Sequence, residues 1–108
     1  MAFRIKHKFG AKQTEIDGKK FSSKKEASYY KNLKIRQKVG EIIFFLRQVG
    51  FDLPGGVRYF IDFVEFHAPK NGDQGDVIFT EVKGFPTPVG SLKIKMTEDL
   101  YGIKINII

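Results

Sequence analysis

The sequence predicts an α/β protein in which two helices flank one mixed β-sheet, preceded by a basic N-terminal arm and hairpin. Two observations carry this prediction. Residues 22–39 place apolar side chains at helical spacing, whereas residues 41–83 contain three segments rich in β-branched and aromatic side chains. A second helical segment and a short apolar segment follow. The expected order is therefore helix, three strands, helix, strand.

The N-terminal part is expected to form a hairpin and then a long helix. Residues 13–21 place an Asp-Gly turn between two short extended segments. The serines at 22–23 are typical of a helix start, and Gly40 is typical of the residue after a helix end, so the helix is expected to run to about Val39. Its expected buried side consists of Ala27, Tyr29, Tyr30 and Leu33.

Three strands are expected next, at residues 41–49, 57–66 and 76–83. A Pro-Gly-Gly turn separates the first two. The sequence HAPKNGDQG separates the second and third, and its residues are typical of a loop, so these strands are expected to pair as a hairpin.

The chain is expected to close with a helix from about Gly90 to Tyr101, ended by Gly102, and a strand in IKINII at 103–108. This strand ends without a charge. Because an exposed apolar edge would pair with other chains, it is expected to be covered, interior or at a dimer interface.

The composition limits the classes of protein. With 108 residues, 42% hydrophobic and 29% charged, residues 1–108 are expected to form a single globular domain, of which 1–21 are the basic arm and hairpin. The absence of cysteine excludes disulfides, thiolate metal sites and cysteine nucleophiles, and fits a cytoplasmic location. No apolar run has the length of a membrane span, and no signal peptide, P-loop or nucleophile elbow is expected.

The charge is unevenly distributed along the chain. The net charge is +7, but residues 1–40 carry twelve basic and three acidic residues, whereas residues 41–108 carry seven basic and nine acidic ones. A basic half beside an acidic half suits a protein that binds a polyanion and places an acidic site next to it. A lysine-rich surface that only aids solubility explains the charge equally well.

Two acidic positions in apolar strands are candidates for chemistry. Asp62 shares a strand face with Phe60 and Val64, and a carboxylate buried there needs a metal ion or a cationic partner. Glu81 and Lys83 share a face at the end of the next strand. If the strands pair, the two carboxylates converge, which favours Mg²⁺ or Mn²⁺, while the lysine can position water or offset phosphate charge. The alternative is an edge aspartate with a solvated salt bridge.

Two further polar residues have two interpretations each. Glu26 points to the same helix side as Tyr30 and Leu33, so it could be a third ligand, but Ser23 three residues earlier also makes it part of a capping box. Gln48 lies in an apolar strand, where it is either an accessory site residue or a hydrogen-bonded core amide.

Taken in order, Glu26, Asp62 and the run from Glu81 to Lys83 resemble the PD-(D/E)XK nuclease superfamily. The segments FSSKKEASYY, YFIDF, EVKGF and YGIKI, with Gln48 between the first two, resemble more closely a small phage-associated branch, over residues from about 9 to the end. Its members were long catalogued as a domain of unknown function and are related to Holliday-junction resolvases.

The resemblance implies a restriction-endonuclease-like core and hydrolysis of DNA phosphodiester bonds with Mg²⁺ or Mn²⁺. It implies that Asp62, Glu81, Glu26 and the carbonyl of Val82 hold the metal ion, and that Lys83 positions the attacking water. The leading proline of the motif is replaced by isoleucine, and Glu81 follows Asp62 by nineteen positions, a long spacing that we attribute to the HAPKNGDQG loop.

The expected function is therefore that of a phage-encoded endonuclease that nicks DNA or selects branched structures, as a homodimer in the host cytoplasm. The alternatives are a non-catalytic nucleic-acid-binding module and a docking subunit of a recombination or packaging complex. Contacts to the DNA backbone, without reading of bases, are expected from basic residues on the two helices and the second strand, namely Lys24, Lys25, Arg58, Lys93 and Lys95.

Overall fold

The computed structural model describes residues 14–82 and 86–108. The predicted basic arm before residue 14 lies outside these ranges. In chain order, the elements are β1 (Thr14–Ile16), β2 (Lys19–Phe21), α1 (Lys24–Lys38), β3 (Ile42–Leu53), β4 (Val57–His67), β5 (Val77–Glu81), α2 (Pro88–Tyr101) and β6 (Ile105–Ile107).

The main sheet is mixed, as the sequence predicts. Its strand order is β3-β4-β5-β6, in which β3, β4 and β5 are antiparallel neighbours and β6 runs parallel to β5. The connection from β5 to β6 passes through α2, because parallel neighbours need a crossover. The strands β1 and β2 form the predicted hairpin apart from this sheet.

The helices begin and end close to the predicted residues. Ser23 caps the start of α1, and Val39 is its C-cap residue. The first turn of α2 contains Pro88 and is capped by Thr87. Gly102 ends α2 with a φ of 65°, a left-handed conformation that glycine adopts without steric strain.

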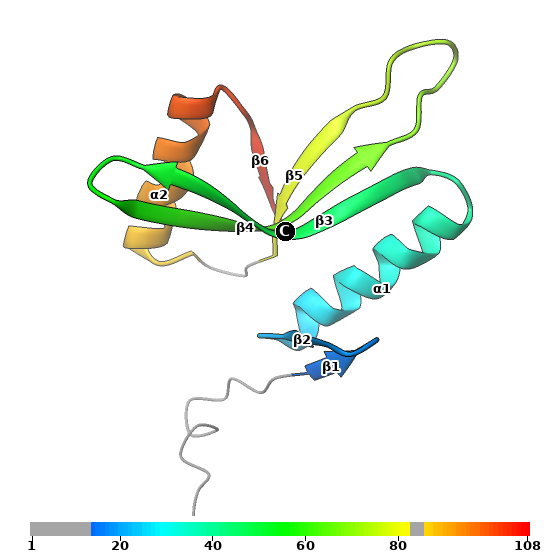
Figure 1. Ribbon diagram of the computed structural model, residues 1–108, viewed down its shortest axis with the longest axis horizontal. Coiled ribbons are helices and arrows are strands. Elements are labelled where there is room, and N and C mark those ends of the chain that lie inside the picture. The colour runs from blue at the N-terminus through cyan, green and yellow to red at the C-terminus, as the bar shows by residue number, and fades with distance from the viewer. Residues whose placement is uncertain (1–13, 83–85) are drawn as a thin grey trace, which may run out of the picture.

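The β3–β4 hairpin twists strongly, so that one of its sides meets each helix in turn. Phe63 of β4 packs in a core cluster with Leu33 of α1, whereas Tyr59 and Ile61 pack in a second cluster with Ile94 of α2. Residues two apart lie on the same side of a strand, so β4 must rotate between these clusters. Figure 1 shows β3 and β4 crossing near the middle of the sheet, with α1 and α2 beside opposite halves. Asp62 lies between Ile61 and Phe63, and therefore between the two clusters.

The strand β3 continues to Leu53, so the predicted end at residue 49 is wrong. Gly50 lies inside the strand, where a Cβ atom would be 3.0 Å from a side-chain carbon of Arg58 and 3.1 Å from the ring of Phe60. The absence of a side chain therefore lets β4 side chains lie across β3 at this position.

The C-terminal strand is shorter and more exposed than predicted. β6 is an edge strand, and only its first residue, Ile105, is buried. Ile107 and Ile108 are 43% and 42% exposed, so the alternatives of a covered or interior strand do not hold for them, and the alternative of a dimer interface stays a prediction. Neither helix in the described part of the chain is long and apolar enough to cross a membrane.

Candidate active site

A single amide joins two of the predicted acidic residues where α1 meets the twisted sheet. Nε2 of Gln48 donates to Oε2 of Glu26 at 3.1 Å and to Oδ1 of Asp62 at 3.0 Å. Glu26 comes from the first turn of α1, and the other two residues face each other across β3 and β4. The structure therefore brings together three residues that are separated by 22 and 14 positions in the chain.

The backbone of Gln48 is strained. Its φ is 50°, in the left-handed region that non-glycine residues rarely adopt and that is unusual within a strand. Such a conformation costs on the order of 1–3 kcal/mol, and strain of this kind clusters at functional sites. In this protein the strained residue is the one whose side-chain amide donates to two carboxylates.

Glu81 lies beside Asp62 on the neighbouring strand. The pairing of Phe63 with Thr80 places these two residues opposite each other at the next position. The main-chain N–H of Asp62 donates to Oε1 of Glu81 at 3.1 Å, and the N–H of Val82 donates to Oδ2 of Asp62 at 2.9 Å. The predicted convergence of the two carboxylates is thus present in the structure.

The pKa of Asp62 is raised to about 6, mainly by burial and in part by the negative charge of Glu81. Hydrogen bonds from the Val82 main chain and from Gln48 act in the opposite direction. Both carboxylates are buried, Asp62 to 9% exposure and Glu81 to 1%. The paired carboxylates therefore hold negative charge that a cation would stabilise.

Glu26 uses different atoms for its two predicted roles. Its main-chain N–H donates to Oγ of Ser23 at 3.1 Å, which caps the helix. Its carboxylate is only 3% exposed and turns toward β3, where Oγ of Ser22 donates to it at 2.9 Å and the guanidinium of Arg47 lies 3.9 Å away. Both predicted roles are therefore compatible.

The remaining predicted residues are not gathered at the network. Lys83 lies outside the described residues, so its role stays a prediction. Arg58 is exposed and pairs with Asp52 at 2.9 Å. The predicted DNA-contact residues lie on three elements, with Lys24 and Lys25 on α1 next to Glu26, Arg58 on β4, and Lys93 and Lys95 on α2.

The donor set fits a hard cation in its chemistry. Asp62 and Glu81 supply adjacent carboxylate oxygens, the ligand type that Mg²⁺ and Mn²⁺ prefer, and Glu26 lies one amide away. Over residues 14–82 and 86–108, no three acidic or histidine side chains are arranged as ligands of one ion. The carboxylates instead accept hydrogen bonds from protein donors.

Two residues of the network were not predicted. The hydroxyl of Tyr59 donates to Oε2 of Glu81 at 2.5 Å, and burial with this bond raises the pKa of the tyrosine. Arg47 contacts Glu26 and precedes Gln48. Its signal in the sequence was a single cation within an apolar strand. Tyr59 carried no signal, because a tyrosine in a strand is ordinary core material.

A further buried carboxylate, that of Glu65, lies on the opposite side of β4 from Asp62. Glu65 is three residues from Asp62, so the two side chains point to opposite sides of the strand. Tyr29 donates a hydrogen bond to it, Thr80 donates another at 2.7 Å, and Nε2 of His67 lies 2.9 Å away. His67 is therefore half-buried and partnered, which differs from the surface position that a histidine at a strand end suggests.

Comparison with known proteins gives a family but no activity. No curated protein and no solved structure matches the chain. A family model described as "Protein of unknown function (DUF1064)" matches residues 6–107, which is nearly the whole sequence. The chain therefore belongs to the DUF1064 family.

Proposed function

We propose that this protein is a metal-dependent DNA endonuclease of the PD-(D/E)XK superfamily. The observation that carries the proposal is the buried pair of Asp62 and Glu81, whose carboxylates meet from neighbouring strands while the pKa of Asp62 is raised to about 6. A protein that only bound nucleic acid would gain nothing from negative charge placed where phosphate must approach.

The topology supports the same proposal. The elements follow the order that the resemblance implies. One helix is followed by three antiparallel strands, a second helix and a last strand that runs parallel to the third strand of the main sheet. Topology alone fixes no activity, since one fold serves many functions. It matters here because it places the first helix, the second strand and the third strand around one network of acidic side chains.

The proposed mechanism assigns roles to the residues of this chain. Asp62 and Glu81 would hold Mg²⁺ or Mn²⁺, with Glu26 and the Val82 carbonyl as further oxygen donors. When bound, such an ion activates water as a nucleophile and stabilises charge that develops on phosphate. Gln48 orients the two carboxylates that it contacts, and Tyr59 orients Glu81.

Other parts of the chain would bind and position the DNA. The lysines at 24 and 25 lie at the start of α1 beside Glu26, where they can contact phosphates of the backbone. Lys83 would position the attacking water. Branched DNA and a homodimer follow from the resemblance to Holliday-junction resolvases, because two active sites suit the cutting of two strands.

One observation favours a second candidate, a non-catalytic nucleic-acid-binding module. Both oxygens of Asp62 accept hydrogen bonds from protein groups, as do both oxygens of Glu81. A network satisfied in this way is also what a purely structural role requires. The docking subunit of a larger complex has no comparable support.

A cleavage assay separates the two candidates. The purified protein is incubated with supercoiled plasmid and with a synthetic four-way junction, in Mg²⁺, in Mn²⁺ and in EDTA. We expect nicking that requires the metal ion and falls by at least about 100-fold in Asp62→Asn, because loss of an essential transition-state contact costs several kcal/mol.

The matched control is Asp99→Asn, which removes an exposed carboxylate from α2 and should cut like the wild type. Equal cutting by Asp62→Asn and the wild type would mean that the activity belongs to a contaminant or to another site. If the wild type binds the junction but cuts nothing with either metal ion, the binding module is the correct candidate.

A further inference from the structure

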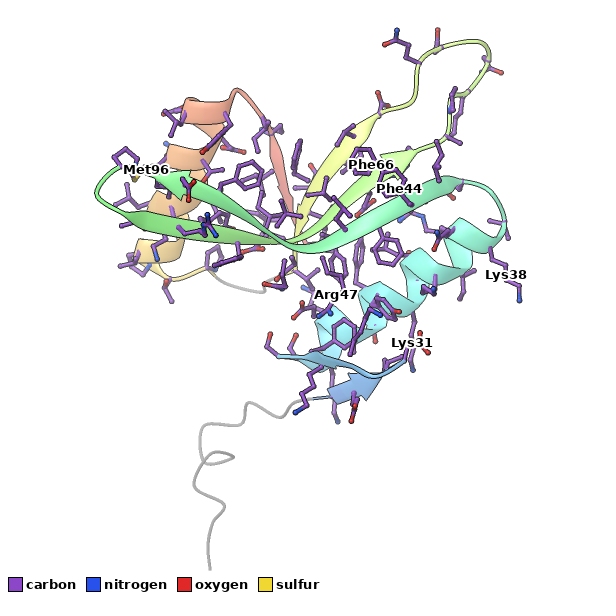
Figure 2. All side chains as sticks on the ribbon, viewed as in Figure 1. Lys31, Lys38, Phe44, Arg47, Phe66 and Met96 are labelled. Carbon is purple, nitrogen blue, oxygen red and sulfur yellow. The ribbon has the colours of Figure 1, made fainter. Side chains whose placement is uncertain are left out.

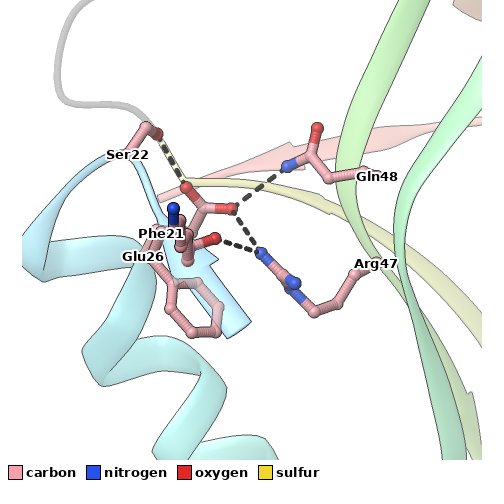
Figure 3. A pocket seen from close by; sticks show the side chains of 6 residues that line it. Phe21, Ser22, Glu26, Arg47 and Gln48 are labelled. Atoms are coloured by element: carbon pink, nitrogen blue, oxygen red, sulfur yellow. Dashed lines mark hydrogen bonds and ion pairs between the residues drawn. The ribbon is translucent and has the colours of Figure 1, made fainter. Parts of the chain in front are cut away.

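A pocket of about 230 Å³ lies beside the acidic network, between the β1–β2 hairpin and β3 (Figure 3). Liquid water occupies about 30 Å³ per molecule, so the pocket has room for a phosphate group and several waters. Two cationic side chains, one carboxylate, two uncharged polar side chains and one aromatic ring line it. These are, in the same order, Lys20 and Arg47, Glu26, Ser22 and Gln48, and Phe21.

The guanidinium of Arg47 is fixed in position at this pocket. Its central carbon lies 4.1 Å from the centre of the Phe21 ring, which is itself buried. Its terminal nitrogen donates to the carbonyl of Lys20 at 3.0 Å and lies 3.9 Å from Glu26. Figure 2 shows the side chain reaching from β3 toward β2 and the start of α1. A fixed guanidinium loses little freedom when it binds a ligand.

Arg47 has donor capacity that the described residues leave unused. Its Nε–H is buried and meets no acceptor anywhere in the described ranges. The contact with Glu26 is a long one, and that carboxylate already accepts hydrogen bonds from Ser22 and Gln48. The charges lining the pocket are two positive and one negative. The lining of the pocket therefore carries more positive than negative charge, and one N–H of Arg47 has no acceptor among the described residues.

The chemistry of these donors suits a phosphate group. A guanidinium presents a planar fork that matches two oxygens of a phosphate, and a nearby ammonium and hydroxyl complete a binding site for it. Gln48 both lines this pocket and donates to Asp62, so an anion bound here lies one side chain away from the acidic pair.

We propose that this pocket binds a phosphate of the DNA strand, adjacent to the one that is cleaved, with Arg47 as the main contact and Lys20 and Ser22 beside it. The assignment of the phosphate to DNA depends on the function proposed above. Arg47 is then a positioning residue, because it fixes the strand rather than touching the reacting atoms. The carboxylate of Glu26 in the pocket accepts hydrogen bonds from Ser22 and Gln48, which leaves Arg47 with only a long contact to it.

The test measures DNA binding without cleavage. Arg47→Met keeps an apolar chain over Phe21 but removes the charge, and Lys20→Met does the same at an exposed position. Each variant is titrated into a fluorescent four-way junction in Ca²⁺ and in EDTA, over a series of salt concentrations. We expect Arg47→Met to bind about 10-fold more weakly and its salt slope to fall by about 1, as for one lost phosphate contact.

Lys38→Met is the control, since it removes an exposed charge from the other end of α1 and should leave the slope unchanged. Circular dichroism melts check that each variant is folded. If Arg47→Met is unfolded, Lys20→Met carries the test and should show a smaller loss of affinity with the same direction of change in slope.

Substitution of single phosphates by neutral methylphosphonate locates the contact. We expect one position in the junction where methylphosphonate weakens binding of the wild type but weakens Arg47→Met no further. An unchanged salt slope in both variants, or Arg47-dependent binding of inorganic phosphate without any change in DNA binding, would overturn the proposal. The nuclease proposal fails separately, if the wild type binds DNA through Arg47 and cuts none.

Discussion

At the scale of single residues, the network contains buried carboxylates whose charge the surrounding protein groups must stabilise. Gln48 takes a strained backbone conformation and donates to two carboxylates, and the main chain of Val82 donates to Asp62. These bonds offset part of the desolvation of the acidic side chains, yet the pKa of Asp62 remains raised. The ionised form of Asp62 therefore lowers the stability of the metal-free protein.

This effect predicts a pH dependence of stability. The pKa of Asp62 is raised from 3.8 to about 6 in the folded protein, so its favourable contribution is present below the unfolded pKa and is lost as the pH rises through 6. We expect the free energy of unfolding in EDTA to fall by about 1–1.5 kcal/mol from this residue between pH 5 and pH 8. Urea unfolding at several pH values measures it.

Asp62→Asn serves as the comparison, because the asparagine stays uncharged over the whole range. The difference in unfolding free energy between pH 5 and pH 8 should shrink by that amount in the variant. The same pH profile in both proteins would show that Asp62 is not the group that titrates. Since other groups contribute equally to both profiles, only the difference between them is used.

The candidate site could be predicted in part because strand periodicity is simple. Asp62 and Glu81 interrupt apolar strands, and a period of two was enough to place them on converging faces. The contribution of Tyr59 could not be predicted, because its hydroxyl donates to a residue 22 positions away on another strand. Arg47 was missed because its partners, Phe21 and Glu26, come from other elements.

At the scale of elements, helix caps and turns could be predicted from the sequence, whereas the ends of strands were predicted less accurately. Local signals such as Ser23 and Gly102 mark helix ends because their effect depends on neighbouring residues alone. The end of β3 depends instead on how β4 packs across Gly50, which is a contact between distant parts of the chain. The mixed sheet was predictable, whereas its twist was not.

The start of α1 allows its two predicted roles to be separated by substitution. Ser23→Ala removes the oxygen that accepts the main-chain N–H of Glu26, so we expect the free energy of unfolding to fall by about 1 kcal/mol. Glu26→Gln leaves that main-chain bond intact, so helix content should be unchanged while metal-dependent cleavage is lost. Circular dichroism, urea unfolding and the plasmid assay report these effects.

Ser28→Ala, at an exposed position further along the same helix, is the control for loss of a hydroxyl. It should change neither stability nor cleavage by a measurable amount. If Glu26→Gln instead lowers helix content while cleavage survives, the carboxylate acts only in capping and must be removed from the proposed site.

At the scale of the whole molecule, an apolar patch remains uncovered in the described structure. Phe45 packs against the α1 cluster, so its neighbour Phe44 points to the other side of the sheet. Phe44 stacks on Phe66 of β4 with ring centres 4.2 Å apart, and Phe66 pairs with Val77 of β5 (Figure 2). Phe44 and Val77 are both more than 40% exposed.

This patch predicts how a homodimer would form. A contiguous apolar surface on a sheet marks an interaction site, and the same patch on two copies can pair about a twofold axis. We expect the protein to sediment at twice its chain mass of 12.4 kDa, and the double variant Phe44→Ser with Val77→Ser to sediment as a monomer. Both side chains are exposed, so the variant should keep its fold.

Ile35→Ser is the matched control, because Ile35 is 62% exposed on α1 and lies away from the patch. It should leave the dimer intact at the same protein concentration in analytical ultracentrifugation. A wild-type protein that remains monomeric at about 100 µM, well above the dissociation constant of any dimer stabilised by 8 kcal/mol, would exclude the patch as a self-association surface. Junction cutting would then require two independently bound monomers, and its rate would rise with the square of protein concentration.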